Sequence, residues 1–251
     1  MNVLELDRIC MQIGGVHITR DVSLSLAPGE RRALIGPNGA GKTTLMNMAA
    51  GALRPTSGRV RLGGRDVTRM PVHRRARRGL ARTFQITNLF PAMTVGENLA
   101  IAVQVASPRR FDPVRPWSRA KAVWAQVDDL LERGGLVPIR DTPVGQLAYG
   151  EQRRLEIVAA VARPSSVILL DEPGAGLSSE ETEVLLDLVF GLDPQLAVMF
   201  IDHDVELAFR MATHVTLLNL GEVVADGSPD DVRAMPIFSQ IYLGGAGHAQ
   251  G

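Results

Sequence analysis

The chain has 251 residues, 45% of them hydrophobic, and its 27 basic and 27 acidic side chains give a formal net charge of +0. This balance gives no electrostatic support for nucleic-acid binding over the whole surface, and no nucleic-acid partner is expected. A single cysteine excludes an internal disulfide framework and fits a reducing compartment. No apolar run approaches the roughly 18 residues of a membrane span, and residues 1–8 do not resemble a signal peptide, so we expect a cytoplasmic protein.

Short β-strands are predicted in the N-terminal part of the chain. Residues 3–6 and 16–26 form the first two, and the second ends at the Pro-Gly turn of residues 27–30. The sequence V-S-L-S-L within the second alternates apolar and polar residues, as a half-buried antiparallel strand does. Residues 59–62 and 65–67 predict a further small hairpin. Together these strands predict an antiparallel β flap that covers a parallel nucleotide-binding core.

A complete G-x-x-x-x-G-K-[ST] phosphate-binding loop lies between a predicted strand at residues 31–35 and a predicted helix at residues 42–50. Its glycines let several backbone N–H groups point at one anion, beside the positive end of the helix dipole. Lys42, one of only two lysines in the chain, can reach the β- and γ-phosphates, and the Thr43 hydroxyl can ligate Mg²⁺. The candidate residues of this loop are Gly36, Pro37, Asn38, Gly39, Ala40, Gly41, Lys42, Thr43 and Thr44.

A basic run follows the flap. It contains Arg69, His73, Arg74, Arg75, Arg77, Arg78 and Arg82. A phosphate or nucleic-acid contact is one interpretation, but we favour a solvated helix face because no aromatic residues for base stacking are interleaved. Gln85 ends the next predicted strand, which would place its side chain at the nucleotide.

The central part of the chain is predicted to be helical. Residues 94–97 (T-V-G-E) form a capping-box pattern that opens a helix to about residue 105, and residues 107–117 contain three prolines and predict a loop. Helical periodicity returns at Ser118 and stops at Gly134-Gly135. We therefore expect one domain over residues 1–243, followed by a flexible tail at 244–251. In that domain residues 1–85 and 164–243 form the core and residues 86–163 form a helical subdomain.

Two apolar strands in the second half are predicted to end in polar side chains. Residues 167–170 (V-I-L-L) lead directly into Asp171 and Glu172, a pattern typical of a buried parallel strand with a ligand at its carboxyl end. Asp171 could hold Mg²⁺ and Glu172 could act as the general base for an attacking water, although two acidic residues could also simply cap the next helix. His203 follows the strand at residues 198–201 and could donate to a γ-phosphate, although a lone histidine after a strand is often structural.

These motifs together resemble the ATP-binding cassette (ABC) ATPases of membrane transporters over residues 3–243. The resemblance rests on the phosphate loop, Gln85 in the Q-loop, the signature segment L-A-Y-G-E-Q-R-R at 147–154, the strand that ends at Asp171-Glu172, the D-loop at 176–178 and the switch histidine His203. It implies an α/β fold of the P-loop NTPase type, with a parallel-sheet core, an antiparallel β flap and a helical subdomain.

The resemblance also implies how the chain works. Two cassettes would form a head-to-tail dimer with two ATP molecules between them, and each phosphate loop would face the signature segment of the other subunit. Gln85 would be a catalytic residue and an Mg²⁺ ligand, and the signature segment would begin a helix over residues 151–163 whose dipole points at the γ-phosphate. The residues that would contact ATP in this segment are Ala148, Tyr149, Gly150 and Glu151.

Within the family, residues 82–102, 147–157 and the C-terminal part of the chain look like the ATPases of branched-chain amino acid importers. Those systems pair two different ATPase subunits with transmembrane permease subunits, and the insertion at 107–117 resembles the larger ATPase. The implied location is the cytoplasmic face of the inner membrane, in a heterodimer or a homodimer. The alternatives are an exporter or lipid-transport cassette, a weakly hydrolysing regulatory cassette and a soluble ABC ATPase outside transport.

Three residues depart from the family pattern. Ile13 stands where an aromatic residue usually stacks on adenine, which predicts weaker ATP binding or looser base selectivity. Ala148 replaces the usual signature serine, and Ser178 replaces the usual D-loop acid. Loss of the serine hydroxyl removes one hydrogen bond to the γ-phosphate in the partner's site. We therefore predict an asymmetric heterodimer. The ATP site built on this chain's phosphate loop would remain competent for hydrolysis, and the site built on the partner's phosphate loop would be weaker.

Overall fold

The computed structural model describes residues 2–83, 89–106 and 121–242. By its contacts the chain divides into two compact units, each described separately. Unit 1 comprises Met1–Leu80, Ser166–Ala175 and Asp193–Gly251, and unit 2 comprises Ala81–Ser165 and Gly176–Leu192. Residues 176–192, which the sequence analysis placed in the core, group with unit 2 because helix α6 (Ser179–Phe190) packs on α5 (Tyr149–Ala160). Gln85, the predicted loop at 107–117 and the predicted tail at 244–251 lie outside the described residues.

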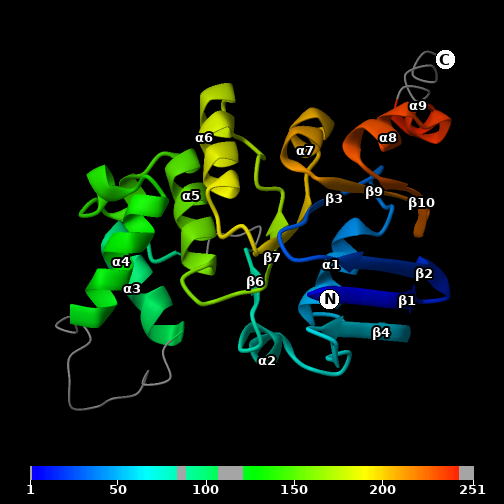
Figure 1. The fold of residues 1–251 in the computed structure, drawn as a ribbon, viewed down its shortest axis with the longest axis horizontal. Coiled ribbons are helices and arrows are strands. Elements are labelled where there is room, and N and C mark those ends of the chain that lie inside the picture. The colour runs from blue at the N-terminus through cyan, green and yellow to red at the C-terminus, as the bar shows by residue number, and fades with distance from the viewer. Residues whose placement is uncertain (1, 84–88, 107–120, 243–251) are drawn as a thin grey trace. The chain divides into compact units, whose positions relative to one another are not determined.

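The antiparallel flap is a four-stranded sheet in unit 1 with the order β2-β1-β4-β5 (Figure 1). Its strands are β1 (Leu4–Ile13), β2 (Val16–Leu26), β4 (Ser57–Leu62) and β5 (Arg65–Asp66). Leu4 pairs with Leu26 on one side and with Leu62 on the other, so one apolar row crosses three strands. Leu4 and Leu6 of β1 are buried and, after a register shift, so are Ile9 and Met11, so the strand buries alternate residues on either side of that irregularity. The flap prediction is confirmed, although β1 extends to Ile13 rather than ending at Leu6.

The second sheet has six strands in the order β10-β9-β3-β8-β7-β6. They are β3 (Arg31–Ile35), β6 (Leu80–Arg82), β7 (Val167–Asp171), β8 (Ala197–Ile201), β9 (His214–Asn219) and β10 (Glu222–Gly227), and the unit boundary follows the first residue of β6. β3 runs parallel to β8 and β9, and β7 runs parallel to β8. Every residue of β7 and β8 is buried, which explains why these strands are apolar apart from Asp171 at the end of β7. The carboxyl ends of β3, β7 and β8 therefore bring their following loops to one edge of the sheet.

Five helices lie in the described part of unit 1. They are α1 (Lys42–Ala50), α2 (Val72–Ala76), α7 (Val205–Met211), α8 (Pro229–Ala234) and α9 (Pro236–Tyr242). α1 has the predicted bounds, between Gly41 and Gly51, which both adopt positive φ. Leu45, Met46 and Met48 of α1 join one apolar cluster with residues of both sheets, among them Leu4 and Leu169. α1 is thus fixed between the flap and the parallel sheet.

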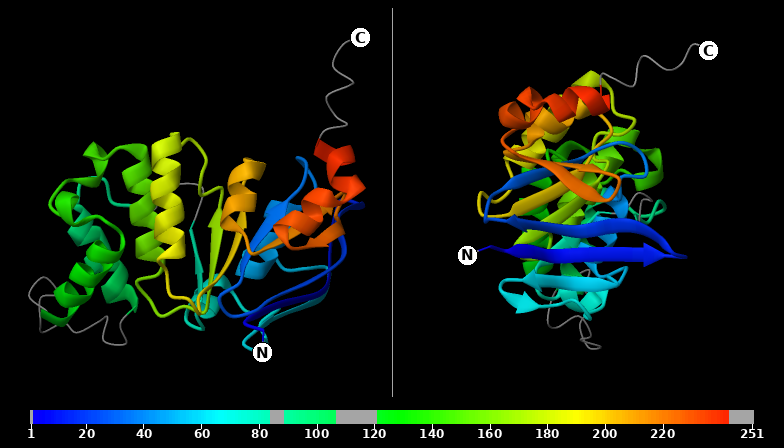
Figure 2. Two further views of the ribbon diagram at one scale, coloured as in Figure 1. Left: turned by 45° about the horizontal axis from the view of Figure 1, so that its top comes forward. Right: turned by 90° about the vertical axis from the view of Figure 1, so that its right-hand side faces the viewer.

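The regular structure described in unit 2 is mainly helical, with two residues of β6. Its helices are α3 (Val95–Ala106), α4 (Lys121–Arg133), α5 and α6, with short 3-10 turns η2 (Val137–Ile139) and η3 (Val144–Gln146). The predicted capping box forms: the Thr94 N–H donates to Glu97 Oε2 at 2.8 Å and the Glu97 N–H donates to Thr94 Oγ1 at 3.2 Å. α5 covers 149–160 rather than the predicted 151–163. Figure 2 shows α5 and α6 side by side.

The basic run corrects one expectation. Most of its arginines are exposed, but Arg75 on α2 is fully buried and is not part of a solvated helix face. Its guanidinium lies against the carboxyl end of α1, where it donates to Met48 O and Ala49 O, each at 2.7 Å. Sequence periodicity could not show this because α2 has only five residues. Over the described residues, no helix has the length and apolar character needed to cross a membrane.

Candidate nucleotide-binding site

The phosphate loop connects β3 to α1 through glycines that no other residue could replace without strain. Gly36, Gly39 and Gly41 have φ values of 145°, 80° and 99°. A Cβ at Gly36 would collide with the carbonyl oxygen of Leu218, and one at Gly41 would lie 2.7 Å from the carbonyl oxygen of Ile18. The loop therefore curls tightly against β9 and β2, as a backbone that must approach a phosphate requires.

The amino end of α1 is open to an anion. In the described structure no side chain caps this end, and the first turn of the helix carries no acidic residue. N–H groups of the first turn have no partner within their own helix, and they carry the positive end of its dipole. Thr43 is exposed in this turn, so its hydroxyl is available to a ligand. These features fit a nucleotide phosphate.

Lys42 lies across the loop. Its Nζ donates to Gly36 O at 2.6 Å and to Pro37 O at 2.9 Å, and the residue is only 6% exposed. Burial lowers the pKa of Lys42 from its usual value, and the nearby charge of Glu172 opposes that effect. The ammonium group is thus held at the loop, between carbonyl oxygens and a carboxylate.

Asp171 ends β7 and Glu172 follows it, at the same edge of the sheet. Asp171 is 3% exposed, and the Glu172 N–H donates to Ile201 O at 2.9 Å, which ties this turn to β8. Glu172 has a φ of 49°, an unfavourable conformation for a side chain of this kind. This turn directs the Glu172 carboxylate to His203, whose Nε2 lies 2.7 Å from Glu172 Oε1. The structure therefore joins Lys42, Glu172 and His203, which are far apart in sequence.

Asp202 is a site residue that the sequence analysis did not single out. It is buried, and its two carboxylate oxygens accept the Gly174 N–H at 2.9 Å and the Asp204 N–H at 3.0 Å. Burial raises the pKa of Asp202, the two backbone hydrogen bonds oppose that effect, and the charges of Asp204 and Glu172 add to it. Asp202 thus fixes the loop after Glu172 to the loop that carries His203. Its position beside His203 was the only signal in the sequence.

Ile13 occupies the exposed end of the β1–β2 hairpin. Its side chain is 57% exposed, and its pairing partner Val16 is 62% exposed. The same hairpin approaches the phosphate loop farther along β2, where Thr19 packs beside Gly41 and the Arg20 N–H donates to Gly221 O. The structure places an aliphatic surface at this end of the flap.

The signature residues are brought together in unit 2 at the amino end of α5. The Ala148 N–H donates to Glu151 Oε2 at 2.9 Å, but alanine has no side-chain acceptor, so only half of a capping box forms. Tyr149 is half exposed, whereas Gly150 is buried against the carboxyl group of Glu181 on α6. Gly150 is therefore required for packing between α5 and α6.

Ser178 has a structural function in the D-loop. It caps α6: its Oγ accepts the Glu181 N–H at 3.2 Å and its own N–H donates to Glu181 Oε2 at 2.9 Å. Hydrogen bonds to the Glu181 carboxyl group from the Ser178 N–H and side chain, with smaller contributions from the Gly150 N–H and the Arg154 charge, lower the pKa of Glu181, while desolvation acts in the opposite direction. Glu181 thus links the D-loop to the signature segment. Gln85 lies outside the described residues, so its predicted position at the nucleotide stays a prediction.

Comparison with known proteins agrees with this geometry. The ABC transporter family matches residues 19–175. The high-affinity branched-chain amino acid transport ATP-binding protein BraF of Pseudomonas aeruginosa is 36% identical over 253 residues, which cover 97% of this chain and 98% of BraF. The lipopolysaccharide export system ATP-binding protein LptB of Acidithiobacillus ferridurans is 35% identical over 228 residues, 90% of each protein. The ADP conformation of MJ1267, an ATP-binding cassette of an ABC transporter, has 27% identity and a TM-score of 0.83 over 97% of this chain and 99% of MJ1267.

The matched segment contains the phosphate loop, the signature segment and the Asp171-Glu172 pair. The similarity to BraF and MJ1267 extends over nearly the whole chain, and it confirms the expected fold of a P-loop NTPase with an antiparallel flap. The chain belongs to the ABC transporter family and is an ATP-binding cassette ATPase.

Proposed function

We propose that the chain hydrolyses Mg-ATP as the energy-coupling subunit of a membrane importer for branched-chain amino acids or a similar small solute. The observation that carries hydrolysis is the 2.7 Å contact between Glu172 Oε1 and His203 Nε2, beside the phosphate loop that holds Lys42. The similarity to BraF over nearly the whole chain supports import.

ATP would bind through its phosphates. The N–H groups of the loop and of the first turn of α1 would donate to the phosphate oxygens, and Lys42 would exchange its two carbonyl partners for the β- and γ-phosphates. Thr43 and Asp171, with Gln85 as a further ligand, would hold Mg²⁺. Over the described residues no three His, Cys, Asp or Glu side chains gather into a metal site. This fits a Mg²⁺ ion that is bound through phosphates, water and few protein ligands. Mg²⁺ would neutralise charge on the phosphates.

Hydrolysis would proceed at the carboxyl end of β7. Glu172 would accept a proton from a water molecule as its oxygen attacks the γ-phosphorus, and the bond to the bridging oxygen of ADP would break. His203 would hold the Glu172 carboxylate in place, as it does here, and could also donate to the γ-phosphate. Asp202 would hold the loop after Glu172 against the loop that carries His203, through its hydrogen bonds to the Gly174 and Asp204 N–H groups.

The active assembly would be a head-to-tail dimer that binds two ATP molecules. Residues 148–151 of this chain would face the ATP bound by the second cassette. Ala148 offers no hydroxyl to that γ-phosphate, and Ser178 caps α6 in place of an acidic D-loop residue. We infer an asymmetric heterodimer that works at the cytoplasmic face of the membrane through permease subunits, with a homodimer as the alternative.

The hydrolytic proposal is tested by ATPase measurements on the purified chain at increasing protein concentration, with Glu172→Gln as the inactive variant. Tight Mg-ATP binding with little hydrolysis, followed by hydrolysis in a complex with the second cassette and permease, supports the heterodimer. A rate that rises with concentration in the chain alone and disappears in Glu172→Gln supports the homodimer instead.

The direction of transport needs a separate experiment. A specific observation favours export as the second candidate, namely the 35% identity to LptB over 90% of the chain. Cells that produce only Glu172→Gln should lose uptake of labelled leucine, isoleucine or valine if the chain serves an importer. Normal uptake together with a defect in surface lipopolysaccharide would instead identify the chain as an exporter subunit.

A further inference from the structure

A second polar cavity lies in unit 1, at the carboxyl end of α1. It has a volume of about 680 Å³ and is lined by residues from two segments, 54–59 and 66–74. The phosphate loop is at the opposite end of this nine-residue helix, which at 1.5 Å per residue places the two sites about 14 Å apart. The cavity is therefore separate from the site proposed for ATP.

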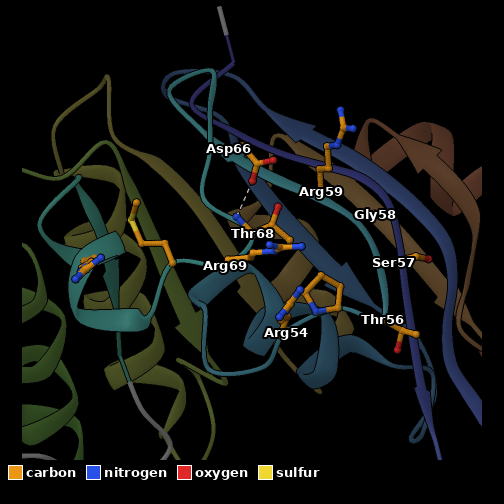
Figure 3. Close-up of a pocket in the computed structure, with 11 residues that line it drawn as sticks. Arg54, Thr56, Ser57, Gly58, Arg59, Asp66, Thr68 and Arg69 are labelled. Carbon is orange, nitrogen blue, oxygen red and sulfur yellow. Dashed lines mark hydrogen bonds between the residues drawn. The ribbon is translucent and has the colours of Figure 1, made fainter.

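The cavity is strongly basic. Arg54, Arg59, Arg69 and Arg74 line it, and Asp66 is its single acidic residue. Figure 3 shows Arg54 and Arg69 near the centre of the view, with Asp66 above them and the side chain of Arg59 extending upward, away from both. Over the described residues, none of these four guanidinium groups forms a hydrogen bond or an ion pair. Five donors on each guanidinium are thus available to a ligand.

Asp66 does not neutralise this charge. Its Oδ1 accepts the Thr68 N–H at 2.8 Å, the contact drawn as a dashed line in Figure 3. Hydrogen bonds from the Thr68 side chain and backbone, with smaller effects of Arg59 and Arg61, lower the pKa of Asp66, while slight burial acts in the opposite direction. The lining therefore carries one carboxylate against four exposed arginines.

Arg75 adds a fixed positive charge behind the wall of the cavity. In addition to its bonds to Met48 O and Ala49 O, Arg75 donates through Nε to Met70 O at 3.0 Å and through Nη2 to Thr68 O at 3.1 Å. Met70 and Thr68 both line the cavity. All four partners are carbonyl oxygens, so the charge has no carboxylate partner among them. Burial lowers the pKa of Arg75 to about 10, with the charge of Asp66 opposing, so Arg75 stays charged at neutral pH.

Two glycines make this arrangement possible. Gly51 has a φ of 84°, and a Cβ there would lie 2.7 Å from Arg75 Nε, so glycine leaves room for the buried guanidinium. Gly58 has a φ of 93°, and a Cβ there would collide with the carbonyl oxygen of Arg8 on the neighbouring strand. The wall of the cavity is thus built on a fixed backbone and not on a free loop.

We propose that this cavity binds a multiply charged phosphate-bearing anion. Guanidinium groups match the geometry of phosphate oxygens and form paired, charge-assisted hydrogen bonds with them. The volume lies in the range of small-molecule sites, roughly 300–1,000 Å³. A soluble phosphate compound and the headgroup of an anionic phospholipid share this chemistry, and they are separated by experiment.

The test compares Arg69→Glu with Arg65→Glu. Both residues are exposed arginines of the same region, so the two substitutions change the net charge by the same amount. Only Arg69 lines the cavity, so only its substitution changes the proposed site. Binding of inorganic pyrophosphate is measured by calorimetry with the phosphate loop saturated by Mg-ADP, and again in Lys42→Ala as a background without a competent phosphate loop. Sedimentation with phosphatidylcholine vesicles, with and without phosphatidylglycerol, tests the lipid source. Thermal unfolding confirms that each variant is folded.

Pyrophosphate binding that Arg69→Glu weakens by about tenfold or more, and that Arg65→Glu leaves within about twofold, supports a soluble ligand. Sedimentation with phosphatidylglycerol vesicles that Arg69→Glu abolishes and Arg65→Glu preserves supports a lipid headgroup. The proposal is overturned if neither probe binds outside the phosphate loop or if the two variants weaken binding equally. Binding of an acidic peptide without binding of either phosphate probe would also overturn it, because the face would then be a protein contact.

Discussion

Asp202 connects two loops that each carry a residue proposed to act in ATP hydrolysis. Its two oxygens hold the N–H groups of Gly174 and Asp204, one on either side of the Glu172–His203 contact. A side chain in this position can set the geometry of Glu172, the proposed general base, without touching the substrate. Asp202 can hold the two loops because it is buried and accepts hydrogen bonds from two backbone N–H groups. Neither feature can be predicted from one aspartate in the sequence.

Replacement of Asp202 by asparagine should separate hydrolysis from binding. An amide keeps one acceptor oxygen and turns the other position into a donor, so one of the two backbone N–H groups loses its partner. We expect the ATPase rate of the assembled complex to fall about tenfold or more, while Mg-ATP affinity changes less than about threefold. Rates and affinities measured in parallel check this. A matched loss of affinity and rate would mean that Asp202 mainly holds the fold.

Ile13 predicts a change in nucleotide affinity. An aromatic side chain at this exposed end of the flap would stack on adenine, which is worth roughly 1–3 kcal/mol per base. Ile13→Tyr should therefore tighten ATP binding about fivefold to a hundredfold. Val16→Tyr, at the paired and equally exposed position, is the control and should have a small effect. Equal ATP and GTP affinities in the natural chain and in Ile13→Tyr would contradict a base contact at this position.

At the level of the helix, Arg75 ends α1 in an unusual way. Gly51 closes the helix through its backbone, and the guanidinium of Arg75 satisfies Met48 O and Ala49 O from a different helix. Arg75→Met keeps the side-chain length but leaves these buried carbonyls without that donor. We expect a loss of roughly 2–4 kcal/mol in the free energy of unfolding.

Arg74→Met is the matched control, since Arg74 is exposed on the same short helix. This substitution should change the free energy of unfolding by no more than about 0.5 kcal/mol. Urea unfolding of the two variants measures both values. Similar losses in both would show that the buried guanidinium does not support α1.

Three strands of the parallel sheet are joined by a polar network. Arg32 on β3 donates to Glu30 Oε1 at 2.7 Å and to Asp226 Oδ1 on β10 at 2.6 Å, and His214 on β9 contacts Asp226 Oδ2 at 3.0 Å. Burial acts to raise the pKa of Asp226. Hydrogen bonds from Thr216 and His214 and the charge of Arg32 outweigh burial and lower this pKa.

This network predicts a pH-dependent contribution to stability. A carboxyl group with a lowered folded-state pKa favours the folded state above its unfolded pKa, near 3.8, and loses that contribution as pH falls through the folded-state value. The difference in stability between the natural chain and Asp226→Asn should therefore be largest near neutral pH and shrink below about pH 4. Chemical unfolding at a series of pH values measures it. A constant difference across the series would contradict the prediction.

At the scale of the assembled molecule, Ala148 and Ser178 would determine what this chain contributes to a second cassette in the proposed head-to-tail dimer. The amino end of α5 offers a ligand the positive end of the helix dipole and the backbone of residues 148–151. Its N-cap residue, Ala148, offers no side-chain hydroxyl. Ala148→Ser should restore one charge-assisted hydrogen bond, worth roughly 1.5–3 kcal/mol, in the partner's site. We expect a rise in the ATPase rate of the complex of about tenfold. An unchanged rate would argue against an asymmetric pair.

Sequence patterns predicted the flap, the phosphate loop, α1, the capping box of α3 and the strands β7 and β8. Each depends on local chemistry: glycines that permit positive φ, alternation that matches a pleat, and apolar runs that match burial on both faces. Short segments were predicted less well. The five residues of α2 are too few for periodicity to show which side is buried, so Arg75 was placed on the surface.

The sequence alone determined the ATP-binding chemistry, because the phosphate loop and the acidic end of β7 are each continuous segments whose function follows from residue type and spacing. Only the tertiary structure decided which distant residues act together. Glu172 meets His203 because β7 and β8 are adjacent and parallel, Asp202 bridges their loops, and α6 joins α5 through Gly150 and Glu181. Packing also set the grouping of residues 176–192 and the basic cavity lined by Arg54, Arg59, Arg69 and Arg74, since long-range contacts leave no periodic trace in the chain.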